Sequence, residues 1–217
     1  MTTDCRSVRK GIFADLGNVS LCAVTKGASI REIESLLEDL PAVKIIAESR
    51  WPDCEEKFIH FSQLEKHFIG PLQKNKVKKV VPLVDVIQSV DTIDLLEKIN
   101  QAAFQSNKIV KFCFQVNVSR DPLKRGIMPE ELMRVIEAYL ALDLKQVRLI
   151  GLMTIGAQES AEKRREYFRD LRRLFDLVNE RYFPDKPLGT LSMGMSEDFR
   201  EAVLAGATMV RLGSCLF

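Results

Sequence analysis

Hydrophobic and polar positions follow two alternating patterns along this chain. Short runs of β-branched and other apolar residues are separated by longer stretches in which apolar residues recur every three or four positions. The short runs are typical of strands buried on both faces, and the longer stretches are typical of amphipathic helices. The predicted strands are Ser20–Lys26, Val43–Glu48, His67–Gly70, Val84–Val90, Ile109–Val118, Val147–Thr154, Gly189–Met193 and Met209–Gly213.

Three predicted helices show the helical spacing most clearly, and the third of them runs from Ala161 to about Arg181. Ser29 and Ser196 stand where helix N-caps belong, and Glu32 completes a capping-box pattern with Ser29. The apolar faces comprise Ile30, Ile33, Leu37 and Leu40 in the first helix, Leu132, Val135, Ile136 and Tyr139 in the second, and Phe168, Leu171, Phe175 and Val178 in the third.

The order of these elements predicts the fold class. Eight strands with seven intervening helices indicate an α/β protein that closes into a single (β/α)8 TIM-type barrel. An open doubly wound sheet is the alternative, but no GxGxxG motif follows the first strand. We expect one domain over residues 1–217, with a short N-terminal segment over 1–19 and no closing helix after the last strand.

Composition narrows the functional classes. Apolar residues make up 46% of the chain, enough for a large core, and a net charge of +2 argues against a nucleic-acid partner. No apolar run approaches the roughly 18 residues of a membrane span, and the polar first twenty residues do not resemble a signal peptide. The five cysteines form no CxxC pair, and the two histidines show no metal-ligand spacing. We therefore expect reduced thiols, a cytoplasmic location, no bound metal and no membrane partner.

Lys26 is the first candidate for chemistry, because it ends the apolar run LCAVTK. Active sites of such barrels lie where the strands end. Desolvation there favours the neutral amine, which is the form that attacks an aldehyde. The alternative is a lysine whose ammonium group simply reaches solvent at a strand end.

Two glycine–serine segments follow the last two predicted strands. LSMGMSEDF provides Ser192, Met195 and Ser196, and VRLGSCLF provides Gly213 and Ser214. Phosphate sites in TIM-type barrels are often built from the loops after strands seven and eight. With a helix expected to start near Glu197, these hydroxyl groups and backbone N–H groups predict an anion site, although Ser196 alone could be only an N-cap.

Arg211 lies two positions before Gly213, so both residues face the same side of the last strand. A buried arginine needs an acceptor, and a pyridine nitrogen or a phosphate would serve. A salt bridge to Glu48 or Asp91 is the alternative. His67 is more typical of a satisfied core histidine than of a catalytic one.

The chain resembles the YggS-like pyridoxal 5'-phosphate (PLP) homeostasis proteins, also known as the proline synthetase co-transcribed family. The resemblance spans nearly the whole chain and is most specific in GLMTIG, LSMGMS and VRLGS. The matching segments are AVTK (23–26), HFIGPLQKNK (67–76), QSVD (88–91), QVNVS (115–119), KRGI (124–127), GLMTIG (151–156), LSMGMSEDF (191–199) and AGATMVRLGSCLF (205–217).

This resemblance implies a barrel related to the N-terminal domain of alanine racemase, with PLP held by Lys26 as a Schiff base. It places Arg211 against the pyridine nitrogen. The family's Gly-Glu-Asn segment reads Ala47-Glu48-Ser49 here, which leaves a cofactor contact by Ser49 open. It further implies that the phosphate is held by Ser192, Ser196, Gly213, Ser214 and backbone N–H groups near Met195.

Three functions remain in competition. The resemblance favours a monomeric PLP carrier in PLP homeostasis, without established catalysis, with apo PLP-dependent enzymes or amino acids as candidate partners. A PLP-dependent amino-acid racemase is the alternative, but such an enzyme needs a second base opposite the lysine, and the three tyrosines fall on predicted helices. A third possibility is a barrel without PLP that acts on a phosphorylated metabolite.

Overall fold

The computed structural model describes the backbone of residues 5–156 and 159–217 and the side chains from residue 9 onward. Eight parallel strands form a closed barrel in sequence order, and β8 pairs with β1. The TIM-type prediction is therefore confirmed, and the open doubly wound alternative is wrong. The strands are β1 (Ser20–Val24), β2 (Ile45–Glu48), β3 (Glu65–Phe68), β4 (Val86–Val90), β5 (Val110–Gln115), β6 (Val147–Met153), β7 (Thr190–Ser192) and β8 (Met209–Leu212).

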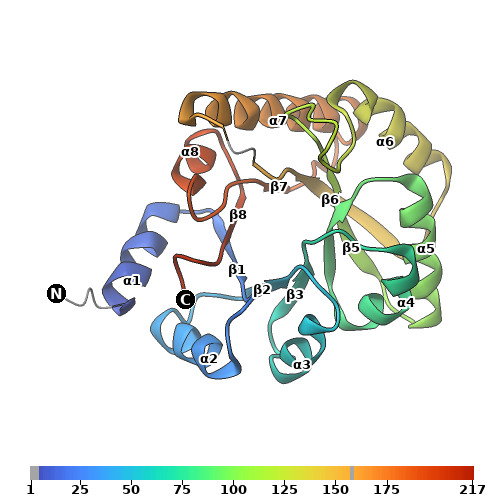
Figure 1. Cartoon of the computed structure of the whole chain (residues 1–217). Coiled ribbons are helices and arrows are strands. Elements are labelled where there is room, and N and C mark those ends of the chain that lie inside the picture. Colours follow the sequence, from blue (N-terminus) through green and yellow to red (C-terminus); the bar gives the residue numbers. More distant parts are fainter. Residues whose placement is uncertain (1–4, 157–158) are drawn as a thin grey trace.

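Helices surround the barrel, as Figure 1 shows. Between β3 and β4 the connection consists of short pieces, η1 (Lys74–Lys76), α4 (Val77–Val80) and η2 (Val81–Leu83), and η3 (Pro129–Glu131) precedes α6. The other helices are α1 (Cys5–Leu16), α2 (Ile30–Asp39), α3 (Asp53–His60), α5 (Ile93–Gln105), α6 (Leu132–Ala141), α7 (Ala161–Tyr182) and α8 (Phe199–Leu204).

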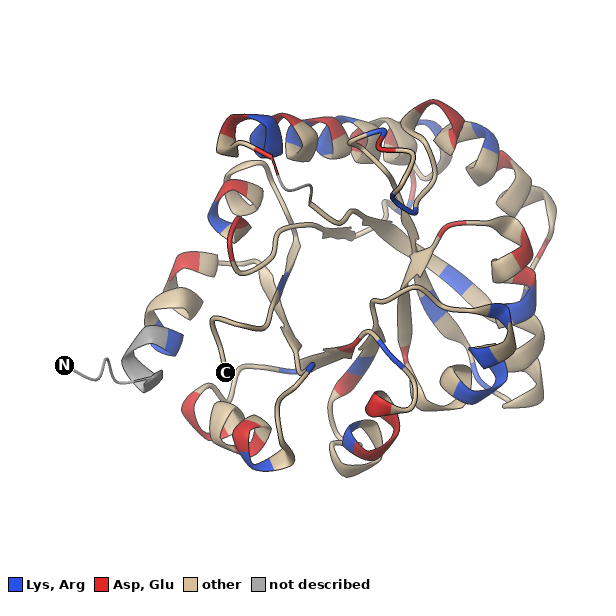
Figure 2. Ribbon diagram, in the orientation of Figure 1, with Lys and Arg blue, Asp and Glu red and all other residues tan. Residues whose placement is uncertain are grey.

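The helical spacings in the sequence have the expected physical basis. Ser29 caps α2 in a full capping box with Glu32, as predicted. All four apolar residues predicted for the inner face of α7 are buried against the barrel. Most of the charged residues lie on the outer helices and loops, and few lie on the strands (Figure 2).

The bounds of helix α1 within the segment 1–19 were not predicted. The helix contacts α2, α8 and β1, so it lies where the ring of helices passes from the end of the chain back to its start. Arg9 fastens it there, because its Nε donates to the Leu216 carbonyl over 2.8 Å and its Nη1 lies 2.7 Å from Asp39 Oδ2. The N-terminal helix thereby covers the seam between β8 and β1.

Several strands are shorter or shifted relative to the prediction. β1 ends at Val24 rather than Lys26, and β5 ends at Gln115 rather than Val118. Val116 and Val118 are buried but belong to the following loop, where Val116 bridges to Ile127. Because the loop is packed, its apolar residues continue the strand-like sequence pattern beyond the last hydrogen-bonded residue of the strand.

We call the ends of the barrel where the strands finish the C-terminal mouth, and the opposite end the N-terminal mouth. The hydrophobic core lies between the strands and the surrounding helices. Large side chains such as Phe112, Phe114 and Phe168 are fully buried within it. Cys22, Cys54, Cys113 and Cys215 are free thiols. Within the described residues, no helix is long and apolar enough to cross a membrane, and no cluster suited to a metal ion is present.

Candidate functional site

Lys26 lies at the C-terminal mouth, two residues beyond the end of β1. Thr25 fixes the turn, because its hydroxyl group donates to Glu48 Oε1 over 2.7 Å. Gly27 follows with a φ of +81°, a conformation that residues with a Cβ rarely adopt. The Lys26 side chain is exposed, so the expectation that a buried strand end desolvates it is wrong. Lys26 does lie at the end of the barrel where the strands finish, as predicted.

A cavity of about 450 Å³ opens beside Lys26. We call it the Lys26–Arg211 cavity. Its walls come from the ends of β1, β3 and β8, the loops after β6 and β7, and the first turn of α7. The lining residues are Val24, Lys26, Ile69, Gly156, Arg164, Met195, Ser196, Glu197, Asp198, Arg211, Gly213 and Ser214.

Arg211 closes the floor of this cavity from β8. Its side chain is 3% exposed, and burial lowers the pKa of its guanidinium below the ordinary value. Nη1 donates to Ser192 Oγ over 2.8 Å, and Nη2 donates to the Thr154 carbonyl over 2.7 Å. Arg211 makes no other hydrogen bond to a described residue, so its remaining N–H groups can donate to a group in the cavity.

The alternative of a salt bridge from Arg211 to Glu48 or Asp91 is wrong. Glu48 pairs with Lys57 over 2.6 Å, and Asp91 pairs with Arg125 over 3.1 Å. No ion pair among the described residues involves Arg211. Its charge is therefore balanced only by dipoles and by more distant carboxylates.

Ser192 lies apart from the other predicted phosphate ligands. It is fully buried at the end of β7 and does not line the Lys26–Arg211 cavity. Its hydroxyl accepts from Arg211 and donates to Gln88 Oε1 over 2.7 Å. The predicted contact with phosphate is corrected to a contact with Arg211.

The loop after β7 does not form the predicted helix start. α8 begins at Phe199, so Ser196 is not its N-cap. Asp198 folds back instead, and its Oδ1 accepts from the Met195 N–H over 2.7 Å, so that backbone group is already engaged. Ser196 accepts from the Gly213 N–H over 3.2 Å, which joins the loops after β7 and β8.

Arg164, in the first turn of α7, was not predicted as a site residue. Its Nε is buried and has no hydrogen-bond partner among the described residues, and it lies 3.9 Å from Asp198 Oδ2. Burial of Asp198 raises the pKa of its carboxyl, although the Met195 N–H and Arg164 oppose this. In the sequence, Arg164 is one of many charged residues of α7. It stands out only in the folded barrel, where it lines the Lys26–Arg211 cavity.

Ser49 faces a different space. It lines a second cavity of about 510 Å³ together with Lys26, Arg50, Lys76 and Arg125. Ser49 does not line the Lys26–Arg211 cavity, so the structure places it beside Lys26 but apart from Arg211.

Comparison with known proteins identifies the family. The model of the alanine racemase N-terminal domain matches residues 5–217. A pyridoxal phosphate homeostasis protein of Aquifex aeolicus is 38% identical over 201 residues, covering 90% of this chain and 86% of that relative. The chain belongs to the pyridoxal phosphate homeostasis protein family. A member from Synechocystis sp. is 37% identical over 216 residues, covering 97% of this chain and 96% of that relative.

Solved structures agree with this family. PipY of Synechococcus elongatus PCC7942, solved with PLP bound, is similar with a TM-score of 0.86 and 28% identity, covering 99% of this chain and 100% of that one. An alanine racemase of Clostridium difficile is similar with a TM-score of 0.77 and 18% identity, and this chain covers 59% of its length. At that identity the likeness shows the shared barrel fold alone.

Proposed function

We propose that this protein binds PLP in the Lys26–Arg211 cavity, holds it reversibly through Lys26 and so serves PLP homeostasis. The observation that carries the proposal is the placement of one exposed amine and one buried, carboxylate-free guanidinium on the same cavity. The PLP bound to PipY and the names of the curated relatives support the same ligand for this chain.

The residues present fit this cofactor. PLP carries a phosphate dianion, and three cations, Lys26, Arg164 and Arg211, line the cavity against two carboxylates, Asp198 and Glu197. The Arg164 Nε is a buried donor without a partner among the described residues, as a bound anion would require. A volume of about 450 Å³ lies within the range of small-molecule sites.

Gly213 lets the loop after β8 approach β1 closely. A Cβ at this position would lie 3.1 Å from the Val24 carbonyl oxygen and 3.3 Å from the Val24 Cβ. Because those contacts are tight, a larger residue would push the loop after β8 away from β1. The glycine therefore keeps the backbone near Ser214 next to Lys26.

The roles follow from the chemistry of each side chain. Lys26 would hold the cofactor by condensing with its aldehyde with release of water, and Ser196, Ser214 and Arg164 would supply donors for the phosphate. Arg211 would lie against the ring nitrogen, where its positive charge would disfavour protonation of that nitrogen. PLP supplies an electrophilic aldehyde and an electron-withdrawing ring, and an unprotonated ring is the weaker electron sink.

We further propose that binding, not turnover, is the function. A racemase needs a second base opposite the lysine, and a tyrosine is the residue expected there. None of the three tyrosines lines the Lys26–Arg211 cavity. Tyr139 lies on α6 at the other mouth, Tyr167 lies on α7, and Tyr182 ends α7 with its hydroxyl donating to Glu137.

A spectroscopic titration tests the binding proposal. We expect PLP to give a visible absorbance band with the wild-type protein and no such band with Lys26→Ala. Lys78→Ala is the matched control, because Lys78 is exposed on α4 and lines neither of the two cavities beside Lys26. An unchanged band in Lys26→Ala would contradict the proposal, and absence of the band in the wild type would favour a barrel without PLP.

Proton exchange separates the carrier from the racemase. With PLP bound, amino acids incubated with the protein in deuterated water are expected to keep their α-proton. Exchange at the α-carbon that is lost in Lys26→Ala would favour the racemase alternative.

A further inference from the structure

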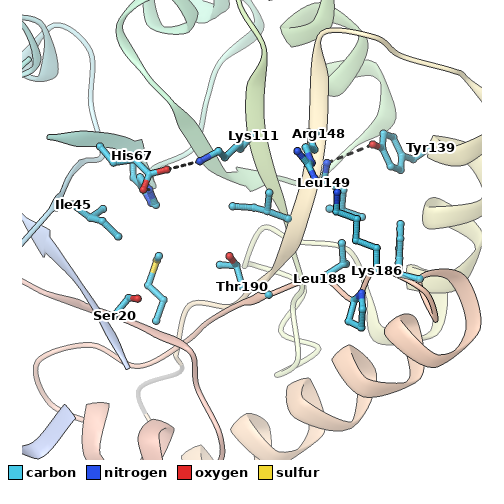
Figure 3. Close-up of a pocket in the computed structure, with 16 residues that line it drawn as sticks. Ser20, Ile45, His67, Lys111, Tyr139, Arg148, Leu149, Lys186, Leu188 and Thr190 are labelled. Atoms are coloured by element: carbon cyan, nitrogen blue, oxygen red, sulfur yellow. Dashed lines mark hydrogen bonds and ion pairs between the residues drawn. The ribbon is translucent and has the colours of Figure 1, made fainter. Parts of the chain in front are cut away.

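The N-terminal mouth of the barrel contains a cavity that the cofactor site does not use. Its volume is about 550 Å³, and polar and apolar residues share its walls. Figure 3 shows Ser20, Ile45 and His67 on one side, Lys186 and Leu188 on the other, and Thr190 between them. The cavity lies at the starts of β1, β2, β3, β7 and β8, and the Lys26–Arg211 cavity lies at the opposite ends of β1 and β8.

His67 supplies an unused donor to this cavity. Its side chain is 1% exposed, and its Nε2 has no hydrogen-bond partner among the described residues. The nearest carboxylate oxygen, Glu65 Oε2, lies 3.8 Å away, which is beyond hydrogen-bond distance. Lys111 holds that carboxylate instead, with Nζ 2.9 Å from Glu65 Oε1. A buried imidazole nitrogen without a partner is costly, and a ligand would satisfy it.

A chain of hydrogen bonds through the barrel determines which nitrogen of His67 carries the proton. A guanidinium can only donate, so Ser192 accepts from Arg211 and gives its own proton to Gln88 Oε1. The Gln88 amide nitrogen then faces His67 Nδ1 over 2.7 Å and the Met209 sulfur over 3.3 Å. Nδ1 must accept, so the neutral ring carries its proton on Nε2, the atom without a partner.

Two cationic side chains lie at the opposite end of the cavity. Arg148 and Lys186 line it, both are exposed, and neither forms an ion pair with any described residue. Between them and His67 the wall contains apolar side chains such as Leu149, Leu188 and Met209. The lining therefore combines a neutral donor beside the Glu65–Lys111 ion pair, an apolar middle and two cations without ion-pair partners among the described residues.

We propose that this cavity is a second binding site, for an elongated organic anion whose acidic group meets Arg148 and Lys186 and whose other end accepts the His67 Nε2–H. The carboxylate or phosphate group of such a ligand would form charge-assisted hydrogen bonds with the two cations. Its middle would cover the apolar wall, and a carbonyl or carboxylate oxygen at its other end would complete His67. The site binds independently of PLP.

Nuclear magnetic resonance of the histidine rings tests this site directly, because the chain has only two histidines. His60 is exposed on α3 and pairs with Glu34 over 3.0 Å, so it serves as an internal control. His60→Gln removes its signal and assigns the remaining ring to His67. The first expected result is a neutral His67 ring with its proton on Nε2, and a proton on Nδ1 instead would overturn the proposal.

The second measurement titrates dicarboxylates of increasing length, succinate, glutarate and adipate, with adipamide as the uncharged control. We expect at least one dicarboxylate to shift the His67 signals saturably, with no shift of His60 and none from adipamide. Arg148→Gln with Lys186→Gln should weaken this binding by about tenfold or more, because each lost charged hydrogen bond is a large fraction of the affinity.

Phosphate is the other anionic group that the two cations could bind, so phenyl phosphate forms a separate arm of the titration. A response to phenyl phosphate but not to the dicarboxylates assigns the site to phosphorylated ligands and still supports an anion site. No saturable shift of His67 with any probe, or equal binding in the double variant, would overturn the proposal. Both substitutions are on exposed side chains, so an unchanged His60 signal verifies that the variant is folded.

Discussion

The two mouths of the barrel both carry more cations than carboxylates, but different parts of the fold supply them. At the C-terminal mouth, Lys26 comes from a turn and Arg164 from a helix, and Arg211 is the one strand residue. At the N-terminal mouth, Glu65, Lys111 and Arg148 are strand residues.

This difference affects how the charges are used. At the N-terminal mouth, Glu65 on β3 and Lys111 on β5 pair over 2.9 Å, whereas Arg148 on β6 forms no ion pair with any described residue. At the C-terminal mouth, the helix residue Arg164 lies 3.9 Å from Asp198 and keeps a buried Nε without a hydrogen-bond partner among the described residues. The loops at the C-terminal mouth therefore form a ready anion site, consistent with the usual position of function in this fold. The N-terminal mouth keeps one buried donor, His67, that the strands leave unpaired.

Among the changes that test this comparison, Arg211→Lys is expected to have the largest effect, a loss of PLP affinity. Lysine keeps the charge but cannot donate to Ser192, to Thr154 and to a ligand in the same fork geometry. We expect PLP affinity to fall about tenfold or more, the loss typical of a charged hydrogen bond. Equilibrium titration of the absorbance band measures it.

Arg200→Lys is the control for this change, because Arg200 is exposed on α8 and pairs with Asp15 over 2.8 Å. Equal PLP affinity in Arg211→Lys and Arg200→Lys would show that the cofactor does not depend on the buried guanidinium.

An intermediate effect is expected from one added methyl group at each mouth. In Gly213→Ala the Cβ meets Val24 atoms at 3.1 and 3.3 Å, whereas in Gly189→Ala it meets nothing within 4 Å. If the overpacking in Gly213→Ala costs about 1 kcal/mol of the free energy of PLP binding, PLP should bind roughly fivefold more weakly to that variant. Binding by Gly189→Ala should match the wild type. If both variants bind PLP equally, PLP binding does not require the close approach of the backbone at Gly213 to β1.

The sequence allowed the eight strands and the location of Lys26 to be predicted, because buried parallel strands are nearly continuous apolar runs. β3 was misplaced because it starts with Glu65 and Lys66, whose charges interrupt the apolar pattern. Those charges are tolerated because Glu65 faces the open N-terminal mouth, where it meets Lys111. The bounds of helix α1 were not predicted, because the helix depends on tertiary contacts such as that of Arg9.

The candidate site was predicted in part. Lys26, Ser196, Arg211, Gly213 and Ser214 do meet at one cavity, because strand ends of a closed barrel converge there. Ser192 was placed wrongly, since its position at the end of β7 points it inward to Arg211. The role of Asp198 in holding the Met195 N–H depends on a turn that competes with the predicted helix start. Such competition between local and tertiary contacts is not visible in residue spacing.

The smallest effect is expected on thermal stability, when acid protonates Glu65 at the N-terminal mouth. The His67 Nε2–H, 3.8 Å from Glu65 Oε2, and the Lys111 ammonium lower the pKa of the Glu65 carboxyl from 4.5 to about 2. Its stabilising effect is therefore present above pH 4.5 and is lost as the pH falls from 4.5 towards 2. In Glu65→Gln the fall in Tm over that range should be smaller than in the wild type. Because the carboxylate is 35% exposed, the difference should be modest.

Glu56→Gln, on the exposed face of α3, is the control and should keep the wild-type dependence of Tm on pH. If Glu65→Gln also keeps it, the ion pair at the N-terminal mouth does not contribute to acid stability.

The attachment of PLP to Lys26 is the central claim, and borohydride reduction followed by mass spectrometry of peptides tests it most directly. After incubation with PLP, we expect one adduct of the mass of reduced PLP, located on the peptide that contains Lys26. The chain has many other exposed lysines, so specificity is part of the result. An adduct spread over several lysines, or none on Lys26, would contradict the account.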